Sequence, residues 1–289
     1  MKDLALLIGN GVNAISKGIT WDNLLDNLLA FCKDDCSIKD KQKPFPLFYE
    51  EIFLNAFKLK RIGKELALKE FIAQNVSRIE ANEIHELIRN IAPAHVITTN
   101  YDFLLEGSEP QKNDGLVYEN LYSIFRRYEI GTTTFWHIHG DCRSPMSINL
   151  GYEHYGGQLQ KMRNYAASVP DYKSNRIVKR SLVKRLQQGK EFEIIQSWID
   201  LFFVKDIHII GLTLDFVETD LWWLLTYRAR QLLYKQKIKF TNNITYYIPE
   251  AFVKTACFKL DLLKANGVEI KVINKAHGIS YYKEILSSI

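Results

Sequence analysis

Short apolar runs that end in small or polar residues recur along the chain, and helical patterns separate them. The runs occupy residues 4–8, 95–98, 134–138, 207–210, 244–248 and 268–273. Continuous apolar runs of this length are typical of strands buried on both faces, because a half-exposed strand would alternate apolar and polar positions. Strands that alternate with helices favour a parallel sheet. The pattern predicts an α/β protein with a Rossmann-like parallel sheet flanked by helices.

The segments between these runs carry apolar residues at helical spacing. A helix is predicted over 21–31, with its leucines on one face. Longer helices are predicted over 214–234 and over 249–266, the second closed by Gly267 as the residue after the C-cap. The stretch 45–90 indicates two or three amphipathic helices with no strand between them.

The 289 residues are interpreted as one domain with two additions to its core. The Rossmann core is expected at about 1–38, 92–142 and 200–289. A helical insertion domain is expected at about 40–92, between the first and second strands. The polar, basic and tyrosine-rich segment at about 142–200 is expected to form a lid or an additional helical layer.

The charge balance is only mildly basic, with 38 Lys and Arg against 33 Asp and Glu and a net charge of +5. The dense basic run 173–190 favours a solvated helix face, with an anion-binding or partner surface as the alternative. Direct nucleic-acid binding is not expected, since a basic face dominating the domain is absent. No stretch is long and apolar enough to span a membrane, and we expect a cytoplasmic protein.

Four cysteines are present, and no two of them form a C-x-x-C pair. They are Cys32, Cys36, Cys142 and Cys257. Paired cysteines at zinc-module spacing are therefore lacking, and reduced thiols are the ordinary state in a cytosolic protein. We expect no zinc and no other metal.

Polar clusters follow four of the predicted strands. They are residues 9–13, 98–102, 137–141 and 211–215. Ligands of parallel α/β sheets bind beyond the carboxyl ends of the strands. Because the four clusters hold equivalent topological positions, the sequence predicts that they form one site.

The first cluster, Gly9-Asn10-Gly11 with Asn13 after it, stands where a dinucleotide phosphate turn belongs. Glycine lets the backbone approach a pyrophosphate because there is no Cβ to clash. The third glycine of the usual fingerprint is absent, and the alternative is a simple tight turn.

The second cluster contains Thr99, Asn100 and Asp102. An asparagine amide carries two donors and an acceptor, so Asn100 can hold a carboxamide, a ribose hydroxyl or a water. The alternative is that Asn100 and Asp102 only cap the following turn.

The third cluster contains two histidines, His137 and His139. Strand alternation predicts that both lie on one face, with His139 at the strand tip as the acid–base candidate. His137 is interpreted as a hydrogen-bonded core histidine. A metal site on the pair is disfavoured, since no further ligand cluster is near in sequence.

The order G-x-G, T-T-N-Y-D, H-x-H-G-D and G-L-T-L-D resembles the sirtuin (silent information regulator) superfamily. Its deacylases carry G-A-G-x-S, T-Q-N-I-D, H-G and G-T-S-L at the same places. The resemblance implies that Asn100 and Asp102 hold the nicotinamide-side ribose and a water, and that His139 is the general base. The residues it implies for NAD binding are Gly9, Asn10, Gly11, Asn13, Thr99, Gly211, Thr213 and Asp215.

Two departures from the deacylases change the implied function. Their four-cysteine zinc module has no counterpart, since the corresponding interval holds only Cys142. Their Ile-Asn strand end is replaced by Ile248-Pro249, for which Asn274 is a weak substitute. The insertion 40–92 instead resembles domains of bacterial anti-phage defence proteins that hydrolyse NAD to nicotinamide and ADP-ribose.

The resemblance thus implies an NAD hydrolase with NAD as its substrate, acting in anti-phage defence. The alternatives are an NAD-dependent protein deacylase or ADP-ribosyltransferase, and a non-catalytic NAD or ADP-ribose sensor. An unregulated enzyme of this kind would deplete its host, so we expect control by a partner protein or by homo-oligomerisation. Candidate contact surfaces are the segment 142–200 and Trp222, Trp223, Tyr227 and Tyr234, with core packing as the alternative for these aromatic residues.

Overall fold

The computed structural model describes residues 2–16, 21–32, 43–113, 118–168, 177, 179–188, 195–234 and 241–289. Cys36 and much of the basic run 173–190 lie outside these residues. The described strands form one eight-stranded sheet in the order β3-β4-β5-β2-β1-β6-β7-β8. The strands are β1 (Lys2–Ile8), β2 (Pro93–Thr98), β3 (Gln111–Asn113), β4 (Arg127–Ile130), β5 (Thr133–His137), β6 (Ile207–Ile210), β7 (Ile244–Pro249) and β8 (Glu269–Ile273).

The strands from β5 to β8 in this order all run parallel to their neighbours. Among them the chain first proceeds outward from β1 through β2 to β5, then returns to the other side of β1 with β6. That reversal is the topological switch point at which doubly wound sheets bind their ligands. The predicted α/β, Rossmann-like fold is confirmed.

An antiparallel edge extends the sheet beyond the predicted parallel strands. β4 pairs with β5 through a tight hairpin in which Ile130 lies opposite Thr133, and β3 then pairs with β4. Gly131 has a φ of 56° in this turn. The sequence analysis missed both strands because they are short and largely polar, whereas it searched for continuous apolar runs.

The helices differ from the prediction mainly at their ends. They are α1 (Trp21–Cys32), α2 (Phe45–Lys58), α3 (Leu66–Val76), α4 (Glu83–Ile91), α5 (Tyr152–Ala167), α6 (Leu182–Gln188), α7 (Trp198–Val204), α8 (Thr219–Leu233), α9 (Cys257–Ala265) and α10 (Ile279–Ser288). The helix predicted from 214 begins at 219, since Leu214 has a φ of 51° that helical backbone does not adopt. The helix predicted over 249–266 divides into a 3₁₀ turn (Glu250–Phe252) and α9. Gly267 follows the C-cap with a φ of 74°, as predicted.

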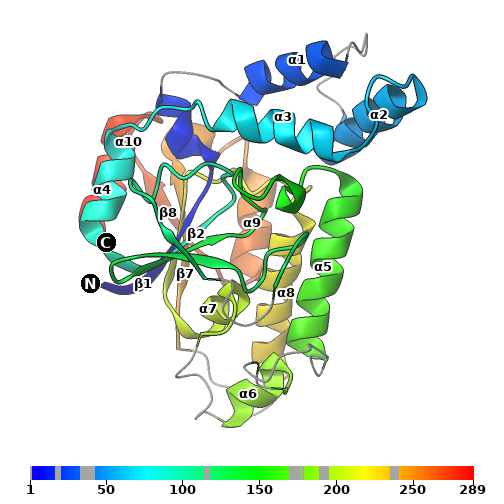
Figure 1. Ribbon diagram of the computed structural model, residues 1–289. Helices are drawn as coiled ribbons and strands as arrows, with labels where there is room; N and C mark the ends of the chain where they lie inside the picture. The colour runs from blue at the N-terminus through cyan, green and yellow to red at the C-terminus, as the bar shows by residue number, and fades with distance from the viewer. Residues whose placement is uncertain are drawn as a thin grey trace.

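Helices cover both faces of the sheet (Figure 1). On one face, α5, α7, α8 and α9 pack in a single apolar cluster with inward residues such as Leu7, Ile97 and Ile209. On the other face, α4 and α10 pack against Leu6, Val96 and their neighbours. The protein is therefore a three-layer α/β/α structure, as burial of strands on both faces requires.

A third apolar cluster lies beyond one end of the sheet, where α1, α2 and α3 gather at the top of Figure 1. It includes Tyr101, which follows β2, and Ile148 and Leu150, which follow β5. Both segments extend from the carboxyl ends of their strands. These three helices therefore pack over the edge of the sheet at which a ligand is expected.

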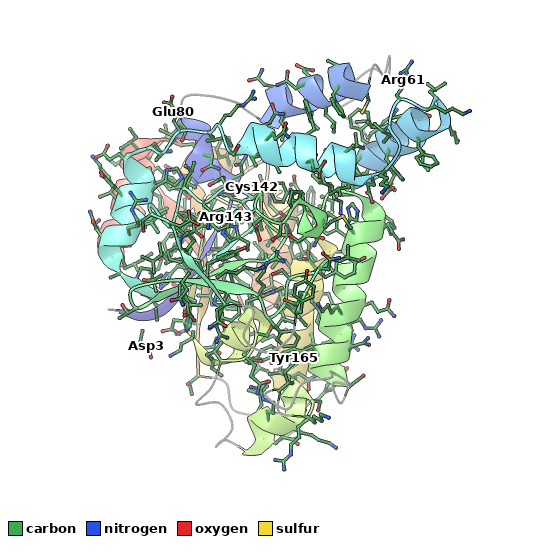
Figure 2. The ribbon with its side chains drawn as sticks, viewed as in Figure 1. Asp3, Arg61, Glu80, Cys142, Arg143 and Tyr165 are labelled. Atoms are coloured by element: carbon green, nitrogen blue, oxygen red, sulfur yellow. The ribbon has the colours of Figure 1, made fainter. Side chains whose placement is uncertain are left out.

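The described parts of the segment 142–200 contribute to the main core. Arg185 on α6 is buried and binds Asp200 on α7, and Tyr165 on α5 donates to the same carboxylate at 2.7 Å. Figure 2 shows Tyr165 among the side chains in the lower part of the molecule. The expectation of a solvated basic face is therefore wrong for Arg185, because Asp200 neutralises its charge inside the protein.

The aromatic residues of α8 divide between core and surface. Trp222, Trp223 and Tyr227 are partly buried against the main core, and the rings of Trp223 and Tyr227 stack at 4.9 Å. Tyr234, at the end of the helix, is half exposed. Core packing therefore accounts for the first three residues.

Candidate active site

A cavity of about 540 Å³ opens at the switch point, between the carboxyl ends of the strands and the helices α1–α3. Leu24, Phe45 and Val76 form its helical wall. The opposite wall contains every predicted site residue except Gly9: Asn10, Gly11, Asn13, Thr99, Asn100, Asp102, His139, Gly211, Thr213 and Asp215. The four polar clusters of the sequence therefore meet around one hollow of a size suited to a small ligand.

The glycines of the first cluster pack the loop after β1 tightly against the loop after β6. A Cβ on Gly9 or on Gly11 would come within 2.6 or 2.7 Å of the Gly211 carbonyl oxygen. The Gly11 N–H donates to that same oxygen at 2.7 Å. Both glycines are therefore required by close backbone approach, and the Gly11 amide is already bonded within the protein.

Asn100 follows β2, and its backbone is held on both sides. Its N–H donates to Thr98 Oγ1 at 3.0 Å, and its carbonyl oxygen lies 2.8 Å from His137 Nδ1. Its side chain is 4% exposed and lines the cavity, yet neither amide atom has a hydrogen-bond partner among the described residues. The Asn100 side chain therefore does not cap the following turn, and its donors and acceptor are left for a ligand.

Asp102 does cap that turn, since its Oδ1 accepts from the Leu104 N–H at 3.1 Å. Its Oδ2 accepts from Asn13 Nδ2 at 2.7 Å. Burial raises the pKa of Asp102, while these two hydrogen bonds oppose the rise. Both carboxylate oxygens are thus engaged inside the protein, although the side chain borders the cavity.

A hydrogen-bond chain from α4 fixes Asn13. The Asn82 N–H donates to His85 Nδ1 at 3.0 Å, so the ring proton of neutral His85 is on Nε2 and points to Asn13 Oδ1 at 2.9 Å. Burial lowers the pKa of His85 to about 4, which keeps the ring neutral near pH 7. The sequence analysis missed this chain, although Asn82 three residues before His85 at a helix start was a capping signal.

His137 and His139 face different partners, so the expectation that they share one face is wrong. β5 ends at His137, and Gly140 then turns the chain with a φ of 88°. His137 is buried, with its Nε2 2.8 Å from Glu106 Oε1 and its ring packed on Phe103. The interpretation of His137 as a hydrogen-bonded core histidine is confirmed.

His139 lines the cavity and is paired with an acidic residue of α8. Its Nε2 lies 2.9 Å from Asp220 Oδ2, and the two side chains are 3% and 0% exposed. The ring also meets Tyr155 edge to face. Burial lowers the pKa of His139, but the charges of Asp220 and Glu218 more than reverse this, so its pKa is raised.

Asp141 fastens the loop that follows β5. Its Oδ2 accepts from Arg126 Nη2 at 2.8 Å and from the Tyr128 hydroxyl at 3.1 Å. Its Oδ1 accepts from the backbone N–H groups of Arg143 and Ser144. Figure 2 shows Cys142 and Arg143, the residues directly after Asp141, in the middle of the molecule below α3.

Glu218 lies just before α8 and also lines the cavity. Its Oε2 is shielded from solvent and has no hydrogen-bond partner in the part of the chain that the structure describes. Burial raises the pKa of Glu218 to about 7, with Asp220 and Asp215 adding to the rise and His139 opposing it. Glu218 and Asp220 were not predicted from the sequence, although acidic residues at the start of the helix 219–233 lay beyond a strand end.

A second cavity of about 530 Å³ adjoins the first beyond β6 and β7. The two share Gly11, Gly211, Leu212, Thr213 and Asp215. Tyr246, Ile248, Pro249, Phe252 and Phe258 are among the residues that line the second. Asn274, suggested as a substitute for the deacylase Asn, is not among them. The predicted Gly211, Thr213 and Asp215 therefore stand between two adjoining cavities.

The described ranges hold neither a cluster of metal ligands nor a membrane-spanning helix. Within them, no group of three or more His, Cys, Asp or Glu side chains is placed to hold a metal ion. No helix of those ranges is long and apolar enough to cross a membrane. Cys142 and Cys257 are free cysteines, and Cys32 is buried.

A comparison with known protein families found a match. The family model of the SIR2-like domain matches residues 94–183, which contain β5, Asn100 and His139. The match covers less than half of the chain and supports a sirtuin-like assignment, which agrees with the Rossmann-like sheet. A SIR2-like domain is typical of proteins that bind NAD, so the match supports an NAD-related function. A search of curated proteins found no match.

Proposed function

We propose that the protein is an NAD hydrolase that cleaves the bond between nicotinamide and ribose, releasing nicotinamide and ADP-ribose. The observation that carries this proposal is the buried amide of Asn100, which borders the cavity with neither of its polar atoms bonded. Leaving both atoms unpaired costs free energy in the unliganded protein, on the order of 1–3 kcal/mol for each group. A ligand with hydroxyl and amide groups, such as the nicotinamide riboside half of NAD, would satisfy them.

The surroundings support cleavage in addition to binding. Breaking the N-glycosidic bond builds positive charge on the ribose, which a buried site with nearby carboxylates stabilises. His139 and Glu218 line the cavity, and Asp220 lies beyond the lining, bonded to His139 Nε2. A sensor that only binds NAD would not need these ionisable groups.

The adjoining cavities support a dinucleotide as the ligand. Each exceeds 500 Å³, and the shared residues Gly11, Gly211, Thr213 and Asp215 lie between them. We assign the polar cavity near Asn100 to the nicotinamide riboside half. The aromatic cavity beyond β7 would hold the adenosine half, with the pyrophosphate passing Thr213.

The physiological role that we propose is NAD depletion in bacterial anti-phage defence, with activity controlled by a partner protein or by self-assembly. The resemblance of the helical insertion to NAD-hydrolysing defence domains supports this role. Exposed apolar side chains on α2, including Leu54 and Phe57, offer surface for such a contact.

The experiment that tests the function is incubation of purified protein with NAD, followed by chromatography of nicotinamide and ADP-ribose. Protein concentration is varied, because control by self-assembly would make turnover depend on it. We expect release of both products by the wild type and its loss in Asn100→Ala and His139→Ala, with circular dichroism showing both variants folded. Wild-type rates in both variants would contradict the proposed mechanism. Turnover of an acyl-lysine peptide would instead identify a deacylase.

A further inference from the structure

Resting on the proposed NAD hydrolysis, we propose that Glu218 is the carboxylate that takes the proton from the attacking water and opposes the positive charge on the nicotinamide ribose. The resemblance to sirtuins assigns no role to this residue. Its position, in the loop between β6 and α8, places it on the cavity wall with Asn100 and His139.

The other acidic groups at the cavity are unsuited to this role. Among the described residues that line it, the acids are Asp102, Asp215 and Glu218. Both oxygens of Asp102 are bonded to Asn13 and Leu104, and Asp215 is exposed to water. Glu218 lines the cavity, and its Oε2 has no hydrogen-bond partner among the described residues. A cavity-lining carboxylate that is not committed to protein donors can accept a proton from a bound water.

His139 is less suited to accept that proton. Its Nε2 is committed to Asp220 at 2.9 Å, and its raised pKa favours the imidazolium, which has no free acceptor. In this assignment His139 is a hydrogen-bond donor toward the ribose, and Asp220 is the positioning residue that holds its ring. The proton acceptor and the donor are thus separate residues on one wall.

The reaction then balances without a further reactant. The water oxygen bonds to C1′ of the nicotinamide ribose, and the bond from C1′ to the nicotinamide nitrogen breaks. Its electron pair stays on that nitrogen, so nicotinamide leaves as a neutral ring. The Glu218 carboxylate takes one proton of the water and later returns it to solvent, while ADP-ribose keeps the new hydroxyl group.

Several charged and titratable groups surround Glu218. They are His139, Asp220, Asp215, Lys259, Tyr101, Tyr155 and Tyr246. Burial raises the pKa of Glu218 to about 7, with Asp220 and Asp215 adding to the rise and His139 and Lys259 opposing it. Glu218 is therefore ionised above pH 7 and protonated below it, so its action on a cationic ligand should depend on pH in this range.

The test compares wild type with Glu218→Gln, which keeps the shape but not the charge. Glu250→Gln is the matched control, because Glu250 is exposed and is not among the lining residues of either cavity. The binding of NADH and of carbocyclic NAD is measured by calorimetry at pH 8 and pH 6. Carbocyclic NAD keeps the cationic ring but has no cleavable glycosidic bond, and it stands for NAD in the affinity measurements. NADH lacks the ring charge of NAD, so the ratio of the two affinities reports the carboxylate without requiring turnover.

We expect the wild type and Glu250→Gln to prefer NAD over NADH by about tenfold at pH 8, with the preference reduced at pH 6. Glu218→Gln should lose the preference at both pH values. Its nicotinamide release should fall by about 10²-fold or more, which is the usual range for a lost general base.

The outcomes separate this inference from the proposed function. An unchanged affinity ratio in Glu218→Gln, or an unchanged rate of nicotinamide release, overturns the role of Glu218 and leaves the NAD hydrolase standing. A wild type that neither binds nor cleaves NAD overturns the proposed function and this inference with it. If the wild type binds NAD without turning it over, the ratio of the NAD and NADH affinities alone decides the role of Glu218.

Discussion

Asp141 and Asn100 follow the neighbouring strands β5 and β2, and both side chains are buried, yet their surroundings are opposite. Asp141 accepts hydrogen bonds on both oxygens, from Arg126, Tyr128 and two backbone N–H groups. Asn100 has no partner on either amide atom among the described residues. The first arrangement stabilises a loop, while the second leaves polar atoms for a ligand.

The comparison shows why a polar residue at a strand end is not by itself evidence of a site. Asp102 and His137 belong to the same two sequence clusters as Asn100 and His139, but their partners are inside the protein. What distinguishes the candidate catalytic residues is an unsatisfied hydrogen-bonding atom or an ion pair at the cavity wall. Mutations can therefore test whether each group acts in stability or in chemistry.

The largest stability loss is expected for Asp141→Ala. The substitution leaves the buried Arg126 guanidinium without its carboxylate and frees two backbone N–H groups. Removing one partner of a buried pair typically costs 3–5 kcal/mol of unfolding free energy. Urea denaturation measures it, with Asp261→Ala on exposed α9 as the control that should change by about 0.5 kcal/mol or less. A loss below about 1 kcal/mol would show that the loop does not depend on this network.

Asn100→Ala should largely abolish activity without loss of stability, in contrast to Asp141→Ala. We expect NAD cleavage to fall by about 10²-fold or more, because the groups that orient the ligand are removed. The free energy of unfolding should not fall, and it should rise by about 1 kcal/mol if the unpaired amide is costly in the folded state. Nicotinamide release and urea denaturation of the same preparation check both parts. A variant that is both active and destabilised would show that Asn100, like Asp141, acts in stability.

Glu218→Gln should stabilise the protein at high pH and not at low pH. The pKa of Glu218 is raised from 4.5 to about 7, so the folded state loses stability as pH rises from 4.5 to 7 and carries the full penalty above 7. Because glutamine has no charge to bury, we expect a gain of about 2 kcal/mol at pH 8, allowing for partial solvation, and none near pH 4. Unfolding curves across this range measure the difference. An equal change in unfolding free energy at both pH values would mean that burial of the Glu218 charge does not destabilise the protein.

The smallest effect is expected for Asp220→Asn, with a pH dependence of the opposite sign. The pKa of His139 is raised in the folded state, so the ion pair stabilises fully below pH 6.5 and its contribution is lost as pH rises through the raised pKa. We expect the variant to be less stable by about 1 kcal/mol at pH 6, with a smaller difference at high pH. Thermal unfolding at several pH values checks this, with histidine chemical shifts reporting the lower pKa of His139. If the loss of stability in Asp220→Asn does not depend on pH, the contact between His139 and Asp220 is a hydrogen bond of the neutral imidazole.

Much of the fold could be predicted from sequence because the parallel strands are buried on both faces. The apolar runs at 4–8, 95–98 and 207–210 had no competing interpretation, and each is a strand. The antiparallel β3 and β4 were missed because an edge hairpin is mostly polar. The start of α8 was placed too early because the left-handed backbone at Leu214 has no sequence signal.

The candidate site was predictable only in part, for a physical reason. Residues at strand ends, such as Asn100 and His139, converge whenever the sheet is parallel, so topology alone brings them to one cavity. Asp220 and Glu218 belong to the start of a helix, and which cavity they reach depends on how α8 packs on the sheet. Likewise, one partner of Asn13 is His85 on α4, 72 positions away in the chain.

The contact of Gly9 and Gly11 with Gly211 has a consequence for redesign of the protein. Where two loops pack this closely, a side chain at any of the three glycines has no room, so this part of the cavity cannot be reshaped by substitution. A library that randomises these three positions should return almost nothing that folds, whereas positions such as Phe216 or Thr213 should accept broad replacement. If the ligand preference changes as this sequence evolves, we expect the substitutions among the other residues that line the cavity, while the three glycines remain.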